Sequence, residues 1–503
     1  MSGNKWLIYG IASIAALGGF IYGVDSGIIA TTLGHDTFKV YMFGPARANA
    51  SLTGAIVSTY NAGQAVGALS TGWLADKFSR RWTIFLSGVL AILGAALQAG
   101  AVNVEMLIVG RTIAGIGCGM ILSAVPIYLA EITPPKQRGF VVGLQGVAIS
   151  LGFMAANWIG YGGAFAVGDV QWRVPLAMQI PGPILLVIGC FFIPYSPRWL
   201  SKNERYEEAE RVLHKLHGKG LTDLVQQEMI QIRDQIAFEN SQQSPGWIAA
   251  VGRLFSRRYL RRTMTATFII TMGQLSGSSV IQNYQNIFYA TVGFTGNTSL
   301  LISGIYGFMG VIGEIIYSLF VADKWPRTTT LWSGSLVLST LIAICMALSA
   351  QFGVRGSNPD GARAAIAFIF IYSASYAVFF NSMIYVVPSE LFPYSLRSKG
   401  LAFAVFVKAI AAIVLSQITP VAIQQVGWRY YSLFIATNAA AAVIYFFFLP
   451  ETGHKSLEEI AELFGDTLAT EHIGEIDVDE KGGRLSIEKN EGLDVNTTRR
   501  SEA

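Results

Sequence analysis

The sequence predicts an all-α membrane protein with twelve transmembrane helices in two pseudo-symmetric six-helix bundles. Of its 503 residues, 52% are hydrophobic and only 14% are charged, whereas about a quarter of an ordinary soluble domain is charged. Long apolar stretches alternate with short charged turns, and two charged motifs recur about half a chain apart. Two matched halves are typical of membrane proteins in which one half rocks against the other.

The apolar stretches give twelve spans, because a helix needs about 20 mostly apolar residues to cross a bilayer. Six spans precede a long polar connection and six follow it. The expected spans are 6–33, 52–74, 82–101, 106–129, 140–163, 174–194, 264–291, 299–321, 329–350, 364–387, 400–424 and 430–449.

Lys and Arg concentrate in alternate connections, which marks those connections as cytoplasmic. They are dense in the 198–262 connection and in the turns after the second, fourth, eighth and tenth spans. We therefore expect a multi-pass protein of the plasma membrane with both termini cytoplasmic. The basic excess is assigned to this topology and to contact with the lipid bilayer, not to nucleic acid.

The expected domains follow from the spans. They are an N-terminal six-helix bundle at 1–195, a cytoplasmic helical connection at 196–262, a C-terminal six-helix bundle at 263–450 and an acidic cytoplasmic tail at 451–503. Acidic residues outnumber basic ones in the tail and aromatic residues are few there, which predicts that most of it is disordered. One chain is sufficient for this architecture, and the oligomeric state is left open.

Two charged motifs are repeated in both halves. E-x-x-P-x-x-x-R occurs at 131–138 and 390–397, and A-D-K-x-x-R occurs at 75–80 and 322–327. Because the spacing repeats, we expect these charges to latch the halves together when the cytoplasmic side is closed. The alternative is a solvated face, where each exposed pair contributes about 0–1 kcal/mol. The expected latch residues are Asp76, Arg80, Arg81, Glu131, Arg138, Asp323, Arg327, Glu390 and Arg397.

Two ionisable residues inside spans form a candidate proton-coupling pair, since such residues are costly in lipid and usually functional. Asp25 lies late in the first span and Arg111 early in the fourth. These spans face one cavity in a two-fold bundle, so the side chains can meet. Asp25 would then release a proton when paired with Arg111 and bind one when the two are separated. The alternative is a static buried ion pair.

The sequence does not indicate an enzyme. It offers no nucleophile–base set, cluster of metal ligands or phosphate-cradling glycine loop. We therefore expect no catalytic residues, no cofactor and no metal site.

Five sequence blocks resemble the sugar porter family of the major facilitator superfamily, with its fungal-type sugar/proton symporters. They are G-W-L-A-D-K-F-S-R-R (72–81), P-I-Y-L-A-E-I-T-P-P-K-Q-R-G (126–139), S-P-R-W-L (196–200), P-S-E-L-F-P-Y-S-L-R (388–397) and P-E-T-G-H-K-S-L-E-E-I (450–460). The blocks occur in the family's order and cover essentially the whole chain. The resemblance implies the major facilitator fold and alternating access around a central site. It also implies proton coupling, because proton-coupled members carry an acid at the position of Asp25.

The resemblance also implies a set of substrate-binding positions in the fifth, seventh, tenth and eleventh spans. Their amide and hydroxyl groups can bind the hydroxyls of a polyol, and the tyrosines can stack on a sugar ring. For any one of these residues taken alone, the alternative is a hydrogen bond between helices. The expected substrate-binding residues are Gln145, Gln274, Ser279, Gln282, Asn283, Tyr284, Tyr385 and Lys408.

Several of these positions depart from the family pattern. In the seventh span, Gly273 replaces the usual first glutamine, Ser279 the asparagine and Asn283 the first tyrosine. Tyr385 takes the place of a tryptophan in the tenth span, and Lys408 that of a glutamine in the eleventh. These changes at direct hexose contacts indicate a substrate other than ordinary glucose.

Lys408 has two possible roles. An isolated charge at mid-span costs at least about 2.5–3.5 kcal/mol, so the ammonium group needs a partner. One reading, slightly favoured, is a structural ion pair with Glu314 of the eighth span, which equally needs a cation. The other reading is a contact with a carboxylate of the substrate, such as a uronic or aldonic acid.

These features together favour a secondary active transporter that imports a sugar or sugar derivative by proton symport. A facilitator or an exporter of a polyol or secondary metabolite is the alternative. A transporter-like nutrient sensor is a third reading, and it is less favoured because the short tail carries no recognisable partner motif.

Overall fold

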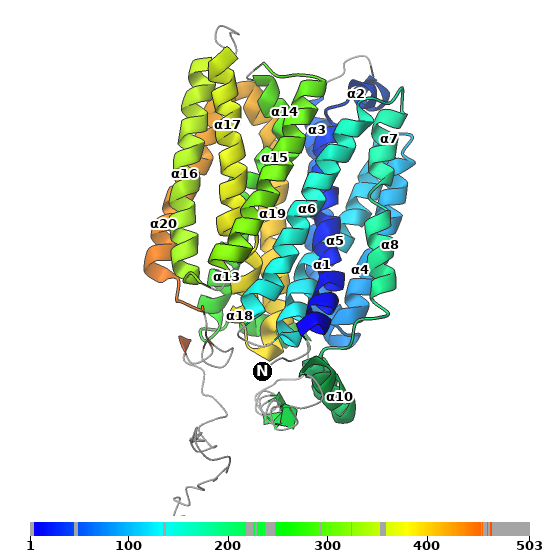
Figure 1. The fold of residues 1–503 in the computed structure, drawn as a ribbon, viewed down its shortest axis with the longest axis vertical. Coiled ribbons are helices and arrows are strands. Elements are labelled where there is room, and N and C mark those ends of the chain that lie inside the picture. Colours follow the sequence, from blue (N-terminus) through cyan, green and yellow to red (C-terminus); the bar gives the residue numbers. More distant parts are fainter. Residues whose placement is uncertain are drawn as a thin grey trace, which may run out of the picture.

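Helices make up nearly all of the described chain, and most run side by side between two opposite ends of the molecule (Figure 1). We call the end with the N terminus and α10 (Tyr206–His217) the linker end, and the opposite end, with α2 (Asp36–Phe43), the α2 end. The computed structural model describes residues 5–44, 49–133, 137–217, 225–226, 229–230, 232–234, 236, 247–291, 293–322, 324–352, 359–453, 455, 460 and 463–464.

The first half of the bundle contains the first six spans. The sixth is broken in two, because Pro181 starts a new helix and lacks the N–H that would continue the previous one. The helices are α1 (Lys5–Thr32), α3 (Ala50–Lys77), α4 (Arg80–Ala99), α5 (Val104–Ile132), α6 (Arg138–Gly163), α7 (Val170–Ala177) and α8 (Pro181–Gly189).

The second half contains the other six spans, three of them broken or modified. The seventh consists of α13 (Leu260–Leu275) and α14 (Ser278–Thr291), and the eighth of α15 (Asn297–Ile316) and the π-helical turn η3 (Tyr317–Val321). The tenth joins α17 (Pro359–Tyr376) through the π-helical turn η4 (Ala377–Asn381) to α18 (Met383–Leu391). The ninth, eleventh and twelfth spans are α16 (Arg327–Phe352), α19 (Tyr394–Val426) and α20 (Tyr431–Phe448), with the 3-10 turn η5 (Gly427–Tyr430) between the last two.

The twelve predicted spans agree with these helices. Nine stretches of the described chain are long and apolar enough to cross a membrane, and one of them, Leu396–Phe448, contains both α19 and α20. Helix α3 and the broken α13–α14 span complete the twelve. All regular structure in the described residues is helical. The predicted fold class is therefore confirmed.

The two halves repeat the same helix contacts. In the first half α1 packs along α6, and in the second α13 packs along α19, so the first and fifth spans of each half are neighbours. Between the halves, α3 packs along α19 and α6 packs along α15. The two-fold relation between the halves maps the α3–α19 contact onto the α15–α6 contact. The interface between the halves is thus built from the second and fifth spans of each half.

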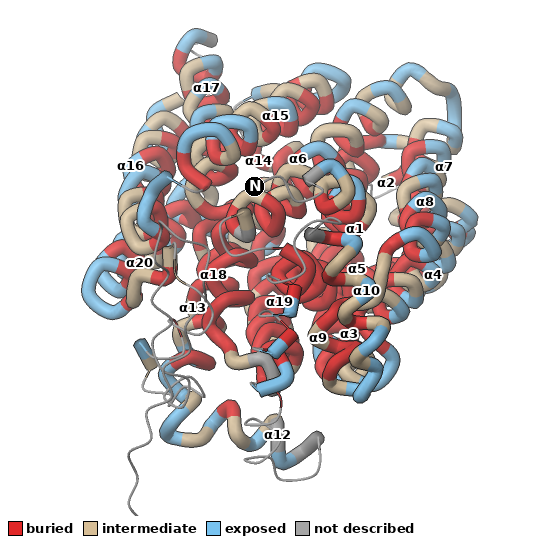
Figure 2. Tube along the Cα trace, turned by 60° about the horizontal axis from the view of Figure 1, so that its bottom comes forward, coloured by how far each residue is buried: buried red, intermediate tan, exposed pale blue. Residues whose placement is uncertain are grey.

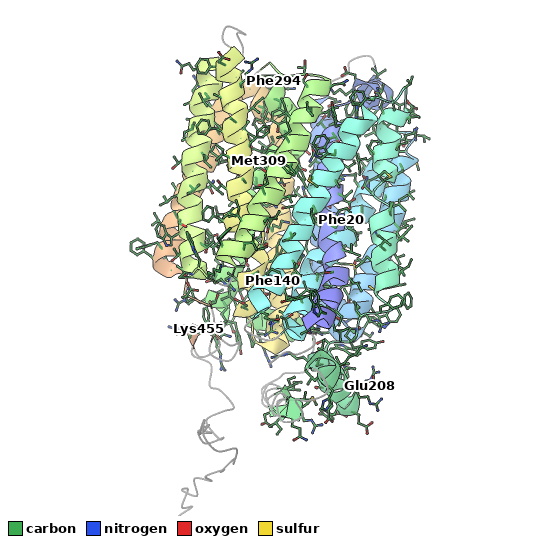
Figure 3. The ribbon with its side chains drawn as sticks, viewed as in Figure 1. Phe20, Phe140, Glu208, Phe294, Met309 and Lys455 are labelled. Atoms are coloured by element: carbon green, nitrogen blue, oxygen red, sulfur yellow. The ribbon has the colours of Figure 1, made fainter. Side chains whose placement is uncertain are left out.

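The outer faces of the helices are apolar, as a lipid environment requires. Buried residues lie on the inner faces and exposed ones on the outer faces (Figure 2). Exposed apolar side chains include Leu93, Phe308 and Phe446. Glu208 and Lys455 lie at the linker end, beyond the spans (Figure 3).

The connection between the halves adds short helices at the linker end. Its described parts contain α9 (Pro197–Lys202), α10 and α12 (Trp247–Leu254), and α9 packs against α10. The predicted disorder of the later tail concerns residues beyond 464, which lie outside the described chain.

Glycine allows helices α3 and α5 to approach closely. A Cβ atom at Gly67 would lie 2.0 Å from the carbonyl oxygen of Ile116, and one at Gly119 would lie 2.2 Å from that of Gln64. Without side chains between them, the two backbones come into direct contact, which is a common way for membrane helices to associate.

We expect Gly67→Ala to destabilise the protein, because the new methyl group has to push α3 away from α5. Overpacking of this kind costs about 1–3 kcal/mol. The thermal unfolding midpoint of the purified protein in detergent should fall clearly below that of the parent. Gly10→Ala is the matched control, because a Cβ atom at Gly10 would have nothing within 4 Å. Equal midpoints for the two variants would contradict close packing at Gly67.

A candidate substrate cavity between the two halves

A small cavity lies at the centre of the bundle, lined by both halves. It encloses about 40 Å³, which is room for only a few water molecules. This space is smaller than a sugar-sized solute requires. The polar residues lining the cavity are Tyr22, Ser26, Ser150, Gln274, Ser279, Gln282, Ser373, Tyr376, Asn381, Tyr385 and Lys408.

Five of the expected substrate-binding residues line this cavity. Gln274 comes from the end of α13, and Ser279 and Gln282 come from the first turns of α14. Neither glutamine side chain is bonded to another described residue, so both amides can bind a solute. Tyr385 on α18 and Lys408 on α19 close the cavity from the second half.

The other three expected residues lie elsewhere. Gln145 is fully buried, and its side-chain amide has no partner within the described chain, but it is not among the cavity-lining residues. Asn283 and Tyr284 line a separate, wider vestibule nearer the α2 end. The Tyr284 hydroxyl donates to the carbonyl oxygen of Ser416 at 2.6 Å, so it holds α14 against α19.

A kink in α14 explains this division. Tyr284 has non-helical backbone angles (φ −122°, ψ 20°), so the helix changes direction there. Ser279 and Gln282, before the kink, line the central cavity, whereas Asn283, directly before it, and Tyr284, at the kink itself, line the vestibule.

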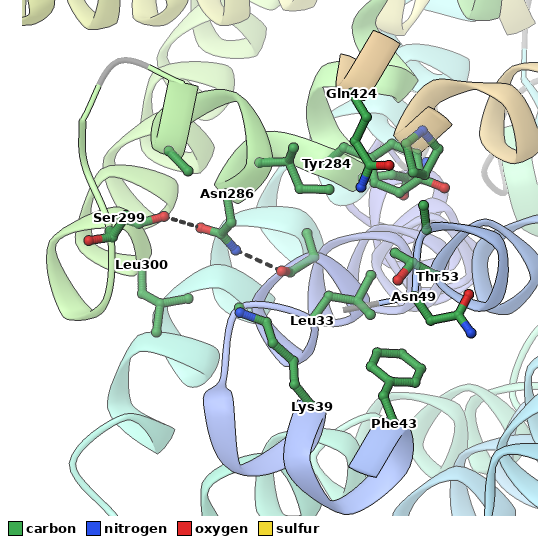
Figure 4. Close-up of a pocket in the computed structure, with 18 of the residues that line it drawn as sticks. Leu33, Lys39, Phe43, Asn49, Thr53, Tyr284, Asn286, Ser299, Leu300 and Gln424 are labelled. Atoms are coloured by element: carbon green, nitrogen blue, oxygen red, sulfur yellow. Dashed lines mark hydrogen bonds between the residues drawn. The ribbon is translucent and has the colours of Figure 1, made fainter. Parts of the chain in front are cut away.

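The vestibule encloses about 320 Å³ between α1, α2, α3, α14, α15 and α19 (Figure 4). Asn286 ties its two sides together: its amide nitrogen donates to the carbonyl oxygen of Ala30 at 2.7 Å, and its oxygen accepts from Ser299 at 2.5 Å. Deeper in the bundle, Gln285 donates to Asn157 of α6 at 2.7 Å. Neutral amide bonds thus hold α14 against the first half at the α2 end.

Asp25 and Arg111 meet, but Arg111 contacts the backbone of Asp25 and not its carboxylate. One guanidinium nitrogen of Arg111 donates to the backbone oxygen of Asp25 at 3.1 Å, and the guanidinium lies 4.2 Å from the ring centre of Tyr60. The Asp25 carboxylate instead accepts from the Cys118 thiol at 3.1 Å. Both residues are buried, and the neighbours of Asp25 on α1, Tyr22 and Ser26, line the cavity.

The expected ion pair between Lys408 and Glu314 is wrong. Glu314 accepts from the amide of Asn381 at 2.6 Å and from the hydroxyl of Ser382 at 3.0 Å. The π-helical turn η4 places Asn381 beside it, and Asn381 also donates to the backbone oxygen of Gly146 in the first half. Neutral donors therefore satisfy Glu314, and no ion pair with Lys408 forms among the described residues.

A charged cluster at the linker end joins the halves, and Asp76 is its centre. Across the interface, Lys399 donates to Asp76 at 2.7 Å and the Ser398 hydroxyl at 3.0 Å. Arg80 and Lys202 lie 3.5 and 3.6 Å from the same carboxylate. Burial raises the pKa of Asp76, but these three cations outweigh burial and lower the pKa to about 2. The linker end is therefore closed by an ionised carboxylate.

The glutamates of the repeated motif bind the segment that follows each half. Arg80 pairs with Glu131 at 3.1 Å, and the Ser196 hydroxyl donates to Glu131 at 2.5 Å, at the start of the connection. In the second half, the Thr452 hydroxyl donates to Glu390 at 3.3 Å, at the start of the tail. The motif thus ties the end of each half to its fourth span, while Asp76 makes the contact across the interface.

The remaining expected latch residues have other contacts or are not described. Arg81 donates to the carbonyl oxygen of Phe191 at 3.2 Å, and Arg397 to that of Phe392 at 3.4 Å. The backbone N–H of Arg327 donates to Glu451 at 2.9 Å. Asp323 and the side chain of Arg138 lie outside the described parts of the chain.

Lys399, Ser398 and Lys202 were missed as partners of Asp76. Lys399 follows the second E-x-x-P-x-x-x-R motif by two residues. A search that extended each motif past its final arginine could have found it. No sequence pattern indicated Lys202, because its distance from Asp76 depends on how the connection folds back against α3.

A model of the family described as "Sugar (and other) transporter" matches residues 11–464, and the chain therefore belongs to that family. It is accordingly a membrane transporter and not an enzyme. The MFS-type transporter criB of Aspergillus cristatus is 34% identical over 462 residues, which cover 92% of this chain and 94% of that protein. The high-affinity glucose transporter of Kluyveromyces lactis is 30% identical over 505 residues, covering 95% and 90%.

Further matches agree. A quinate permease of Neurospora africana is 31% identical over 488 residues, covering 92% of this chain and 89% of that protein. Among solved structures, the proton:xylose symporter XylE bound to 6-bromo-6-deoxy-D-glucose matches with a TM-score of 0.80 and 23% identity. The match covers 92% of this chain and 100% of that one, and it shows that this chain has the major facilitator fold.

We expect Asp76→Asn to open the linker end, because the neutral amide loses its attraction to three cations. The measurement is maleimide labelling of a cysteine placed at Ala402, a buried residue whose Cβ faces Gly72 across the interface. Labelling from the linker side should rise about tenfold, which corresponds to about 1.4 kcal/mol. Asp36→Asn, whose ion pair with Lys39 lies at the α2 end, is the control and should be labelled like the parent.

The same labelling also tests the pH dependence. Since the pKa of Asp76 lies below its ordinary value, its pairing is complete above about pH 4 and is lost only as the pH falls through about 2. Parent labelling should therefore stay constant between about pH 5 and 8. A clear rise in labelling within that interval would contradict the assignment of the latch to Asp76.

Proposed function

We propose that this protein imports a sugar or sugar derivative together with a proton, by alternating access to the central cavity. The proposal is carried by one observation: a cavity with free amide and hydroxyl groups lies between two halves that are tied by different bonds at each end. Breaking the Asp76 contacts would open the linker end, and breaking the Asn286 contact would open the α2 end.

The family relatives support the substrate class. The relatives named above include a high-affinity glucose transporter and a quinate permease. Both named compounds carry several hydroxyl groups on a six-membered ring. Gln274, Ser279 and Gln282 supply the donors and acceptors that such a molecule requires.

Asp25 is the proposed proton carrier. In the proposed cycle, Asp25 binds a proton while the Cys118 thiol, and not Arg111, is the partner of its carboxyl group. It releases the proton when the guanidinium of Arg111 reaches its carboxylate, since a nearby positive charge favours the ionised form. Arg111 already contacts the Asp25 backbone, so this exchange needs only a small rearrangement.

We place the linker end in the cytoplasm and the protein in the plasma membrane. The connections at the linker end carry most of the basic residues, and such loops stay cytoplasmic. Both termini then lie in the cytoplasm, and the α2 vestibule is the entry for the solute. One chain supplies the whole cavity, so a monomer is sufficient for transport.

We expect Asp25→Asn to abolish uphill accumulation and to leave exchange intact, because the amide cannot carry a proton. In proteoliposomes with an imposed pH gradient, the accumulation ratio should fall to about one. Counterflow of labelled for unlabelled substrate should continue. Asp169→Asn, a partly exposed acid paired with Arg173, is the control and should concentrate substrate like the parent.

If Asp25→Asn still concentrates substrate, Asp25 is not the proton carrier. A parent protein that only equilibrates its substrate would be a facilitator, and one that drives it out against the gradient would be an exporter. Binding without any flux would favour the sensor.

A further inference from the structure

Lys408 carries the single charge among the described residues that line the central cavity. Its side chain is 1% exposed. The ammonium nitrogen lies 3.3 Å from the Tyr22 hydroxyl, 3.5 Å from the Tyr385 hydroxyl and 4.9 Å from the centre of the Tyr22 ring. Both hydroxyl partners are neutral, and both distances are long for a hydrogen bond. A buried cation held only by these partners remains short of a counter-ion.

The two other buried acids near the cavity are already bonded. Asn381 and Ser382 donate to Glu314, and Cys118 donates to Asp25. Within the described chain, no carboxylate lies within 4 Å of the Lys408 nitrogen. The negative charge that Lys408 needs therefore has to come from a molecule that enters the cavity.

We propose that Lys408 binds the carboxylate of the transported solute, so that the cavity takes a polyhydroxylated monocarboxylate, a sugar acid, in preference to a neutral sugar. This inference rests on the proposed transport function and names the substrate class at that same site. A carboxylate bound to an ammonium group forms a charge-assisted hydrogen bond, which is stronger than a bond between neutral groups.

The surroundings of Lys408 fit a carboxylate. The hydroxyl oxygens of Tyr22 and Tyr385 accept from the ammonium group, which leaves the hydrogen of each hydroxyl available to a carboxylate beside it. Gln274, which also lines the cavity, keeps its amide free for the hydroxyl groups of the same solute. One end of the cavity thus recognises an anion and the rest recognises a polyol.

The charge carried in each cycle follows from this assignment. A monocarboxylate that enters with one proton adds no net charge to the cavity. A neutral sugar that enters with one proton carries one positive charge. Uptake of a sugar acid should therefore depend on the pH gradient and be insensitive to the membrane potential, whereas neutral sugar symport would respond to both.

Matched solutes test the proposal on the full-length protein in proteoliposomes. The labelled pairs are D-galacturonate with D-galactose, D-glucuronate with D-glucose, and D-gluconate with D-glucitol. Each pair differs at one carbon, which bears a carboxylate in the acid. We expect an imposed pH gradient to drive at least one acid at least tenfold faster than its neutral partner.

Variants then assign that preference to the lysine. Lys408→Gln and Lys408→Met should reduce uptake of the acid at least tenfold and remove the preference for acids. Lys324→Gln is the matched control, because Lys324 lies at the linker end and donates to the carbonyl oxygen of Leu319. It should keep the parental preference. The thermal midpoint of each variant reports whether the protein is folded.

The outcomes separate this inference from the proposed function. If the parent concentrates only neutral members, transport is supported and the carboxylate assignment is overturned. If folded Lys408 variants keep the acid preference, the assignment is also overturned. If the variants do not fold, the parent protein alone tests the substrate class. Faster uptake of an acid than of its neutral partner, insensitive to the membrane potential, supports the carboxylate assignment, and the absence of that preference overturns it. If no member of the panel is taken up, the proposed function fails, and this inference fails with it.

Discussion

The carboxylate of Asp76 is the point on which the closed linker end depends. Lys399 and Ser398 of the second half, Arg80 of the first half and Lys202 of the connection all converge on it. Three parts of the chain, the two halves and the connection between them, are thus held by one ionised group. Because removing one partner of a buried charge cluster leaves the other charges unpaired, the cluster closes or opens as a unit.

The opposite end is closed by a different kind of bond. There α14 is joined to the first half by neutral amides, Asn286 to Ala30 and Gln285 to Asn157. The kink at Tyr284 separates this outer segment from the part of α14 that carries Ser279 and Gln282. The closure is thus ionic at the linker end and made of neutral amide bonds at the α2 end.

The sequence predicted the fold well and the site in part, for physical reasons. Hydropathy defines spans directly, and the resemblance to the sugar porter family implied Gln274, Ser279 and Gln282, which line the cavity. The kink that takes Tyr284 out of the cavity has no proline or glycine at that position to reveal it. The expected partner of Lys408 was wrong because Asn381 and Ser382, neutral residues at a π-helical turn, satisfy Glu314. Neither the kink nor the π-helical turn changes the hydrophobic periodicity from which helices are predicted.

The most direct measurement of the central claim is the distance between spin labels at Phe78 and Trp325, exposed residues near the linker end of the first and second halves. It should be recorded for the parent, for Asp76→Lys, for Lys399→Asp and for the double variant. We predict that each single charge reversal lengthens the distance, because like charges then face each other, and that the double variant restores the parental distribution. Identical distributions in all four proteins would contradict the assignment of the closed linker end to the Asp76 cluster.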